Sequence, residues 1–104
     1  MHQQDNEDLR TKLNLETSRM AWQELQRHFA AGIVVGVAAD LDLVEVAVRI
    51  ANDDKAAVAQ WLAERRIGQV DDVQAADWLA QEAVLWTVVV KPWILVQLEK
   101  PGRA

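Results

Sequence analysis

Apolar residues recur at helical spacing through the first third of the chain. One stripe follows the i, i+3, i+7 pattern of an amphipathic helix, and two leucines one turn apart precede it; the positions are Leu9, Leu13, Trp22, Leu25 and Phe29. Gly32 comes directly after the stripe, where helices commonly end. Thr17 or Ser18 offers a second helix start. The pattern therefore predicts helix over residues 7–31, in two pieces.

The next two segments are rich in β-branched residues. Residues 33–38 form a short run preceded by a glycine, which predicts a strand. In residues 43–50 every even position is β-branched, the period of a half-buried strand. We therefore favour a hairpin of the two segments. A helix stays open for the second segment, because Asp42 and Glu45 form a capping box and Glu45 precedes Arg49 by one turn.

Two short helices are predicted next, at residues 57–64 and 74–81. They share the sequence Trp-Leu-Ala at a spacing of 17 residues, and a pair of aspartates precedes each, as is typical of helix N-caps. Residues 67–70 between them are predicted to be a turn or a short strand.

The last third carries the strongest strand pattern. Residues 85–90 and 93–98 are largely apolar and flank Lys91-Pro92, and the proline marks a turn, bulge or sheet edge because it lacks a backbone donor. The elements together predict an α+β fold, a small antiparallel sheet of three or four strands with three or four helices packed on it. We expect one domain over residues 1–104, with an ordered core at about 7–98 and polar tails at both ends.

Composition and charge narrow the function. The 104 residues carry a net charge of −5, with a pI of about 4.9, and the acids gather in residues 40–82. An acidic surface repels phosphate groups, so nucleic-acid binding is not expected. The chain has no cysteine, which excludes a disulfide scaffold, thiol catalysis and cysteine-ligated metals.

The N-terminal residues and the apolar runs of the chain indicate where in the cell the protein is expected. Residues 1–8 are polar and acidic, without the basic and apolar regions of a secretory signal. No apolar run approaches the ~20 residues of a membrane span. We therefore expect a cytoplasmic protein without membrane contact.

Few side chains suited to catalysis are present. His2 and His28 lack a paired metal-ligand spacing, and neither a nucleophile motif nor a phosphate-binding glycine loop occurs. The sequence therefore predicts no catalytic residue, no metal ligand and no cofactor. We expect His28 to interact with the last carbonyls of its helix, and it could act as a base only with partners from elsewhere in the fold.

The carboxylates are the remaining chemical resource. Asp40 and Asp42 flank the predicted turn and Glu45 is nearby, and oxygen clusters of this kind can hold Mg²⁺ or Ca²⁺. Aspartates are also common in turns because of their local hydrogen bonds, and we favour this structural role.

Tryptophan is abundant, with five residues and no tyrosine. Four lie in apolar patterns and are predicted mainly as core residues: Trp22, Trp61, Trp78 and Trp86. Trp93 follows Pro92 and is either core or an edge-strand anchor for a partner, since tryptophan is enriched among interface hot spots.

Four segments resemble a small family of uncharacterised bacterial proteins, a conserved domain of unknown function. They are KLNLET (12–17), WQELQ (22–26), LDLVEVA (41–47) and VVVKPWILVQ (88–97). The resemblance spans about residues 9–98. It implies a bacterial cytoplasmic origin, and it supplies neither an activity nor functional residues.

Two hypotheses follow for the function. We favour a non-enzymatic protein-interaction module that self-associates, with Trp93 as its binding residue. The alternative is a small carboxylate-based ligand- or divalent-metal-binding protein or enzyme, with a site formed by Asp40, Asp42 and Glu45 and with His28 as a base. The alternative requires that these side chains share one pocket and that the pKa of a carboxylate be raised.

Overall fold

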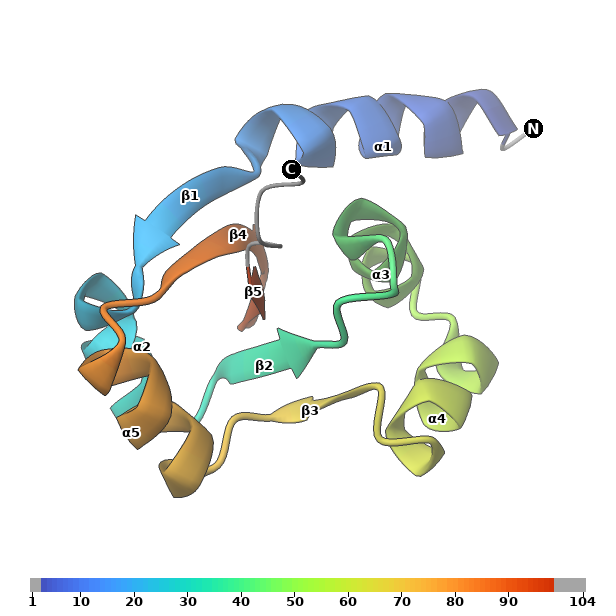
Figure 1. The fold of residues 1–104 in the computed structure, drawn as a ribbon. Coiled ribbons are helices and arrows are strands. Elements are labelled where there is room, and N and C mark those ends of the chain that lie inside the picture. Colours follow the sequence, from blue (N-terminus) through green and yellow to red (C-terminus); the bar gives the residue numbers. More distant parts are fainter. Residues whose placement is uncertain (1–2, 99–104) are drawn as a thin grey trace.

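The computed structural model describes residues 3–98, with side chains described from Glu7 onward. A five-stranded sheet forms its centre, and helices flank it (Figure 1). The elements in chain order are α1 (Gln3–Glu16), β1 (Ser18–Ala21), the 3-10 turn η1 (Trp22–Leu25), α2 (Gln26–Ala30), β2 (Val34–Val37), α3 (Leu43–Ala51), α4 (Lys55–Ala63), β3 (Ile67–Gln69), α5 (Asp72–Ala80), β4 (Val84–Val90) and β5 (Trp93–Leu98).

The strand order across the sheet is β1-β4-β5-β2-β3, so β1 and β3 are the two edges. Three neighbouring pairs are antiparallel, and β2 runs parallel to β5, with Val35 opposite Leu95. The α+β class is confirmed. The sheet is mixed rather than purely antiparallel, because β5 pairs with β2 in parallel. It also has more strands than predicted, because β1 was not foreseen.

Residues 43–50 form the helix α3, so the predicted hairpin is wrong. Asp42 caps α3 through its Oδ1 atom, which accepts hydrogen bonds from the N–H groups of Val44 (3.0 Å) and Glu45 (3.2 Å). One face of α3 buries Leu43, Val46 and Ala47 against the sheet; Val48 is buried as well. The cap and this buried face outweigh the strand preference of the β-branched residues.

The predicted helix over residues 7–31 is interrupted by the edge strand β1. Thr17 does not begin a second helix; its hydroxyl donates to the carbonyl of Leu13 (2.7 Å), in the last turn of α1. β1 then pairs with β4, and the N–H of Trp22 donates to the carbonyl of Ala83 (2.9 Å). β1 has no β-branched residue, so its strand pairing is imposed by β4 rather than by local preference.

Helices cover both faces of the sheet. On one face, side chains of α1, α3 and α4 pack against Val88 and Leu95 in the first core cluster. On the other face, η1, α2 and α5 pack against Leu85 and Val96 in the second cluster, where the rings of Trp22 and Trp78 meet edge to face at 5.0 Å. Burial of these apolar side chains is the main stabilising contribution to the fold.

The tryptophans differ in burial, and the N-terminal helix begins earlier than predicted. Trp22 and Trp78 are core residues as predicted, Trp61 is half-buried, and Trp86 is 36% exposed beneath the guanidinium group of Arg19. At the N-terminal end, α1 already begins at Gln3, four residues before the expected ordered core. The predicted C-terminal tail at 99–104 lies outside the described residues.

The cap of α3 can be tested by Asp42→Ala. We expect the substitution to lower the free energy of unfolding by about 1 kcal/mol, because two N–H groups of the first turn lose their acceptor. The melting temperature, followed by circular dichroism, should fall by about 4–8 °C. Asp77→Ala, in the middle of α5, is the control and should change it little. Equal shifts for both variants would contradict the capping role.

Candidate functional site

An apolar cleft of about 550 Å³ lies on the first-cluster face of the sheet, beside β3. Its apolar lining comes from the strands and from α3 and α4, and includes Val35, Val58, Ile67 and Trp93. We call it the Trp93 cleft. Trp93 begins β5 and is half-buried, because its ring packs on the first core cluster while part of it lines the cleft.

The rim of the Trp93 cleft is charged. Lys55 and Asp53 face each other loosely, with 4.0 Å between the Lys55 Nζ and the Asp53 Oδ2 atoms, and both are exposed. Lys91 completes the rim next to Trp93, and within residues 3–98 it has no ion pair. An apolar floor with a charged rim fits an apolar side chain of a partner better than a small polar substrate.

A second, wider hollow of about 840 Å³ lies on the other side of β3. It is lined by α5 residues and by Gly36, Leu98 and Arg65. The two hollows have Leu62 of α4 and all three residues of β3 in common. The edge strand β3 therefore runs between two depressions of the surface.

The structure does not gather Asp40, Asp42 and Glu45 around one pocket. Asp42 is occupied as the cap of α3, and Asp40 pairs with Arg66 at 2.6 Å. Glu45 pairs with Arg10 of α1 and, at 2.8 Å, with Arg49. Among the described residues, no group of three or more acids or histidines could hold a metal ion. A site formed by these three carboxylates stays a prediction, and none of the cavities described above is lined by all three of them.

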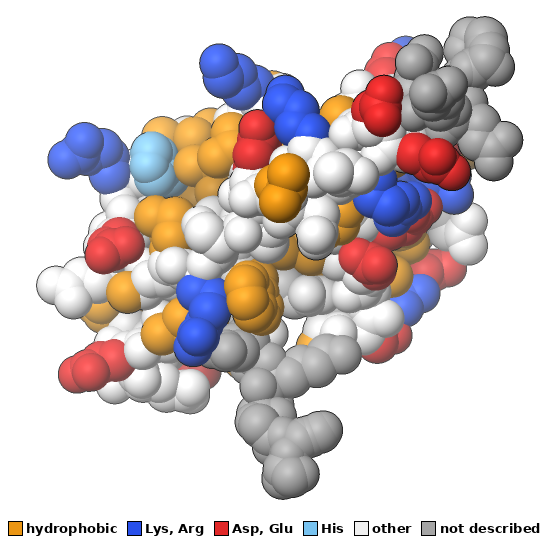
Figure 2. All heavy atoms as spheres, turned by 90° about the horizontal axis from the view of Figure 1, so that it is seen from above, with side chains coloured by type: hydrophobic (Ala, Val, Ile, Leu, Met, Phe, Trp, Pro, Cys, Tyr) orange, Lys and Arg blue, Asp and Glu red, His pale blue; other side chains and the backbone are white. Residues whose placement is uncertain are grey.

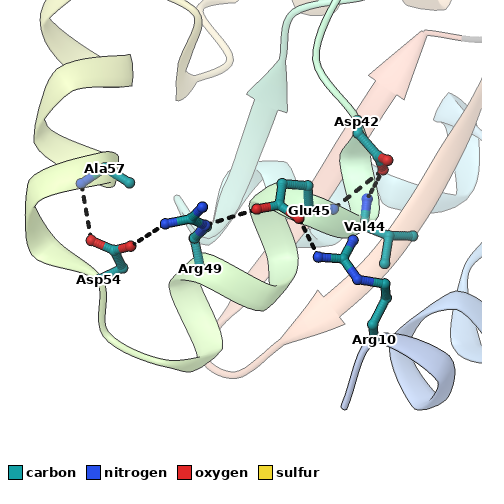
Figure 3. Close-up of polar contacts among 7 residues, drawn as sticks. All are labelled: Arg10, Asp42, Val44, Glu45, Arg49, Asp54 and Ala57. Carbon is teal, nitrogen blue, oxygen red and sulfur yellow. Dashed lines mark hydrogen bonds and ion pairs between the residues drawn. The ribbon is translucent and has the colours of Figure 1, made fainter. Parts of the chain in front are cut away.

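Glu45 belongs instead to a chain of ion pairs that ties three helices together (Figure 3). The chain runs from Arg10 of α1 through Glu45 and Arg49 of α3 to Asp54, the cap of α4. Hydrogen bonds from Arg49 and Arg10 lower the pKa of Glu45. Arg49 and the N–H of Ala57 likewise lower the pKa of Asp54. These shifts favour the charged forms, whereas a general acid needs a raised pKa.

His28 lies apart from these carboxylates. It belongs to α2, beside the second core cluster, and is half-buried. Its carbonyl accepts hydrogen bonds from the N–H groups of Ala31 and Ile33 at the helix end. His28 lines neither hollow beside β3.

Sequence analysis did not single out Gln97, which positions the loop that carries Asp40. Its side chain is buried, and its Nε2 atom donates to the carbonyls of Ala38 (2.8 Å) and Leu41 (2.6 Å). The signal in the sequence is a lone amide within the apolar run of β5. Buried polar groups need partners, so such a residue indicates a backbone segment packed against the strand.

The ion-pair chain predicts how stability depends on pH. Because the folded-state pKa values of Glu45 and Asp54 lie below their ordinary values of 4.5 and 3.8, their contribution is complete above those values and is lost as the pH falls through the folded-state values. Arg49→Gln removes the shared partner. The gap in melting temperature between the native protein and this variant should therefore be widest at about pH 7 and close towards about pH 2.5.

The matched control is Arg27→Gln, at an exposed arginine of α2, which should show no such closing gap. Melting curves of the three proteins across this pH range decide the question. A gap between the native protein and Arg49→Gln that stays constant with pH would contradict the role of these carboxylates.

Comparisons with known proteins agree with the fold and supply no activity. Between Gln3 and Leu98, no helix has the length and apolar character to cross a membrane. No sequence in the comparison with curated proteins is significantly similar to the chain. A solved structure is similar, titled "NMR solution structure of PA1075 from Pseudomonas Aeruginosa": the TM-score is 0.81 at 41% sequence identity, covering 93% of this chain and 90% of that one. A family described as "Protein of unknown function (DUF2288)" matches residues 8–98, and the chain belongs to this family.

Proposed function

We propose that this chain is a non-enzymatic, cytoplasmic protein-interaction module that associates with a second copy of itself. The observation that carries the proposal is the position of Trp93, half-buried in an apolar cleft beside a free sheet edge. Tryptophan in such a cleft offers a large apolar contact area, and tryptophan residues often dominate the binding energy of interfaces.

The charges near β3 support a second copy as the partner. Residues 71–82, which include α5, carry four acids and no base. Arg65 comes just before β3 in the chain, and Lys91 lies on the rim of the Trp93 cleft. Within the described residues, neither base has an ion pair. One copy therefore offers an acidic segment and the other offers unpaired bases, and each copy has both.

On the opposite side of the molecule, the described residues show no such separation of charge. Figure 2 shows this side from above, with acidic and basic side chains interspersed and hydrophobic side chains reaching the surface between them. Interspersed charges are typical of a solvated surface. The contrast favours the β3 side as the interface.

The test is Trp93→Glu, studied by sedimentation velocity over a range of protein concentrations. A charge in the apolar cleft should weaken self-association at least about thirty-fold, the size of a hot-spot substitution. Leu15→Glu is the control, because Leu15 is 78% exposed on α1, away from β3, and the substitution makes the same change of charge.

Trp93 also touches the core, so folding has to be verified for Trp93→Glu by circular dichroism. Lys91→Glu serves as a second variant on the exposed rim of the cleft and should also weaken association. A native protein that stays monomeric up to millimolar concentration would overturn the proposed function.

A further inference from the structure

Within residues 3–98, half of the backbone polar groups of β3 have no strand partner. The N–H of Ala38 donates to the carbonyl of Arg66, and the N–H of Val70 donates to the carbonyl of Val34, with Gly68 opposite Gly36 between them. Residues 66, 68 and 70 therefore direct their backbone polar groups towards β2. Because successive residues of a strand alternate, Ile67 and Gln69 direct theirs away from the sheet.

This alternation makes β3 complementary to itself. In an antiparallel pair of two β3 strands with Gly68 on the twofold axis, Ile67 of one copy lies opposite the partner's Gln69, and both residues offer outward-facing N–H and C=O groups. They exchange two hydrogen bonds, and the symmetry repeats the exchange on the other side of the axis. Gly68 then lies opposite the partner's Gly68 in a non-hydrogen-bonded position.

We propose that two copies of this chain pair along β3, antiparallel and with Gly68 on the twofold axis, to form one continuous sheet. The proposal rests on the proposed function and names the contact that produces the self-association. An unpaired edge strand readily adds another strand in this way.

The ends of β3 carry opposite charges that this register brings together. Arg65 is three residues before Gly68 and Asp71 is three residues after it. Arg65 lies in the turn before β3, with a positive φ of 60°, so antiparallel pairing about Gly68 brings this turn next to the partner's Asp71, twice in the dimer. Asp71 caps α5 with its Oδ1 atom, and among the described residues its other carboxylate oxygen has no partner, so that it can accept from Arg65 of a second copy.

The helices beside β3 lie on different faces of the sheet, which leaves room for the pairing. α4 packs in the first core cluster through Val58 and Trp61, and α5 packs in the second through Ala75 and Trp78. A twofold axis perpendicular to the sheet keeps each helix on its own face. Figure 1 shows α4 and α5 at opposite ends of β3. In the antiparallel dimer, α4 of one copy and α5 of the other copy therefore lie at the same end of the paired strands, on opposite faces of the continuous sheet.

The same arrangement gives the Trp93 cleft an occupant. The partner's α4 arrives on the first-cluster face, at the end of β3 where Gln69 lines the cleft. Its last turn carries Leu62, which is 51% exposed in the single chain. Strand pairing at β3 and burial of the partner's Leu62 in the cleft are therefore parts of one interface.

The other edge of the sheet is less suited to self-pairing. β1 contains Arg19 and no acid, so pairing two β1 strands brings no opposite charges together. Its Arg19 is already stacked on Trp86.

The register is tested by Gly68→Cys in the full-length chain. The position has room, since no atom lies within 4 Å of a Cβ placed there, and the chain has no other cysteine. Facing residues in non-hydrogen-bonded positions have Cα atoms about 4.5 Å apart, within the range of a disulfide. We expect rapid formation of a covalent dimer with oxidised glutathione as the oxidant at micromolar protein. Leu15→Cys, on α1, is the control and should stay largely monomeric.

The hydrogen bonds are tested by Gln69→Pro against Gln69→Ala. Both variants lose the side-chain bond from Gln69 Nε2 to the carbonyl of Gly32 (2.7 Å), and only the proline lacks the outward N–H. Proline is tolerated at such an edge position. We expect Gln69→Pro to weaken self-association about thirty-fold in sedimentation velocity, and Gln69→Ala to weaken it less than about three-fold.

The charge pairs are tested by Arg65→Glu, with Lys12→Glu, at an exposed lysine of α1, as a control of equal charge change. The first variant brings like charges close together twice and should weaken association about ten-fold, whereas the control should change it little. If the native protein dimerises while Gly68→Cys gives no more covalent dimer than Leu15→Cys, and Gln69→Pro still dimerises, the β3 pairing is overturned and the proposed function stands. If the native protein does not associate at all, both are overturned.

Discussion

The parallel pairing of β2 with β5 is the contact on which the rest of the structure depends. The two strands are far apart in the chain, and every element from α3 to β4 lies between them in sequence. A parallel pair needs a long connection, and here that connection contains α3 and α4, which pack on one face, and α5, which packs on the other. Because β5 also pairs with β4 and β2 with β3, this one contact joins the two parts of the sheet. It also sets Trp93 across the sheet from β3, which creates the cleft between them.

Local sequence patterns predicted correctly those helices and strands whose residues all favour the same structure. The strands around Lys91-Pro92 and the two capped helices were foreseen, since apolar runs, proline and aspartate pairs act over a few residues. Residues 67–70 were left between a turn and a short strand, and Ile67–Gln69 form the strand β3. Trp93 is half-buried, and its role as an anchor for a partner stays a prediction.

The errors have a common physical origin in long-range contacts. In α3, the alternation of β-branched residues was a true pattern, but burial of Leu43, Val46 and Ala47 against the sheet decided the structure. β1 is a strand only because β4 offers it a partner far along the chain. Asp40, Asp42 and Glu45 are close in sequence, yet arginines from other elements and the start of α3 determine where each one points. Local sequence does not show which arginine will form an ion pair with each carboxylate.

The attachment of α1 has a consequence for the dynamics of the molecule. Within residues 7–16, Leu13 is buried and Leu9 half-buried, and the other side chains of α1 are exposed. The ion pair from Arg10 to Glu45 adds a link that lies at the surface, where dissolved salt screens it. Opening of α1 therefore exposes far less apolar area than opening of β5, whose Leu95 and Val96 are fully buried. We therefore expect the amide hydrogens of α1 to exchange with solvent through a sub-global opening that leaves the sheet intact, and added salt to speed that exchange without exposing the core.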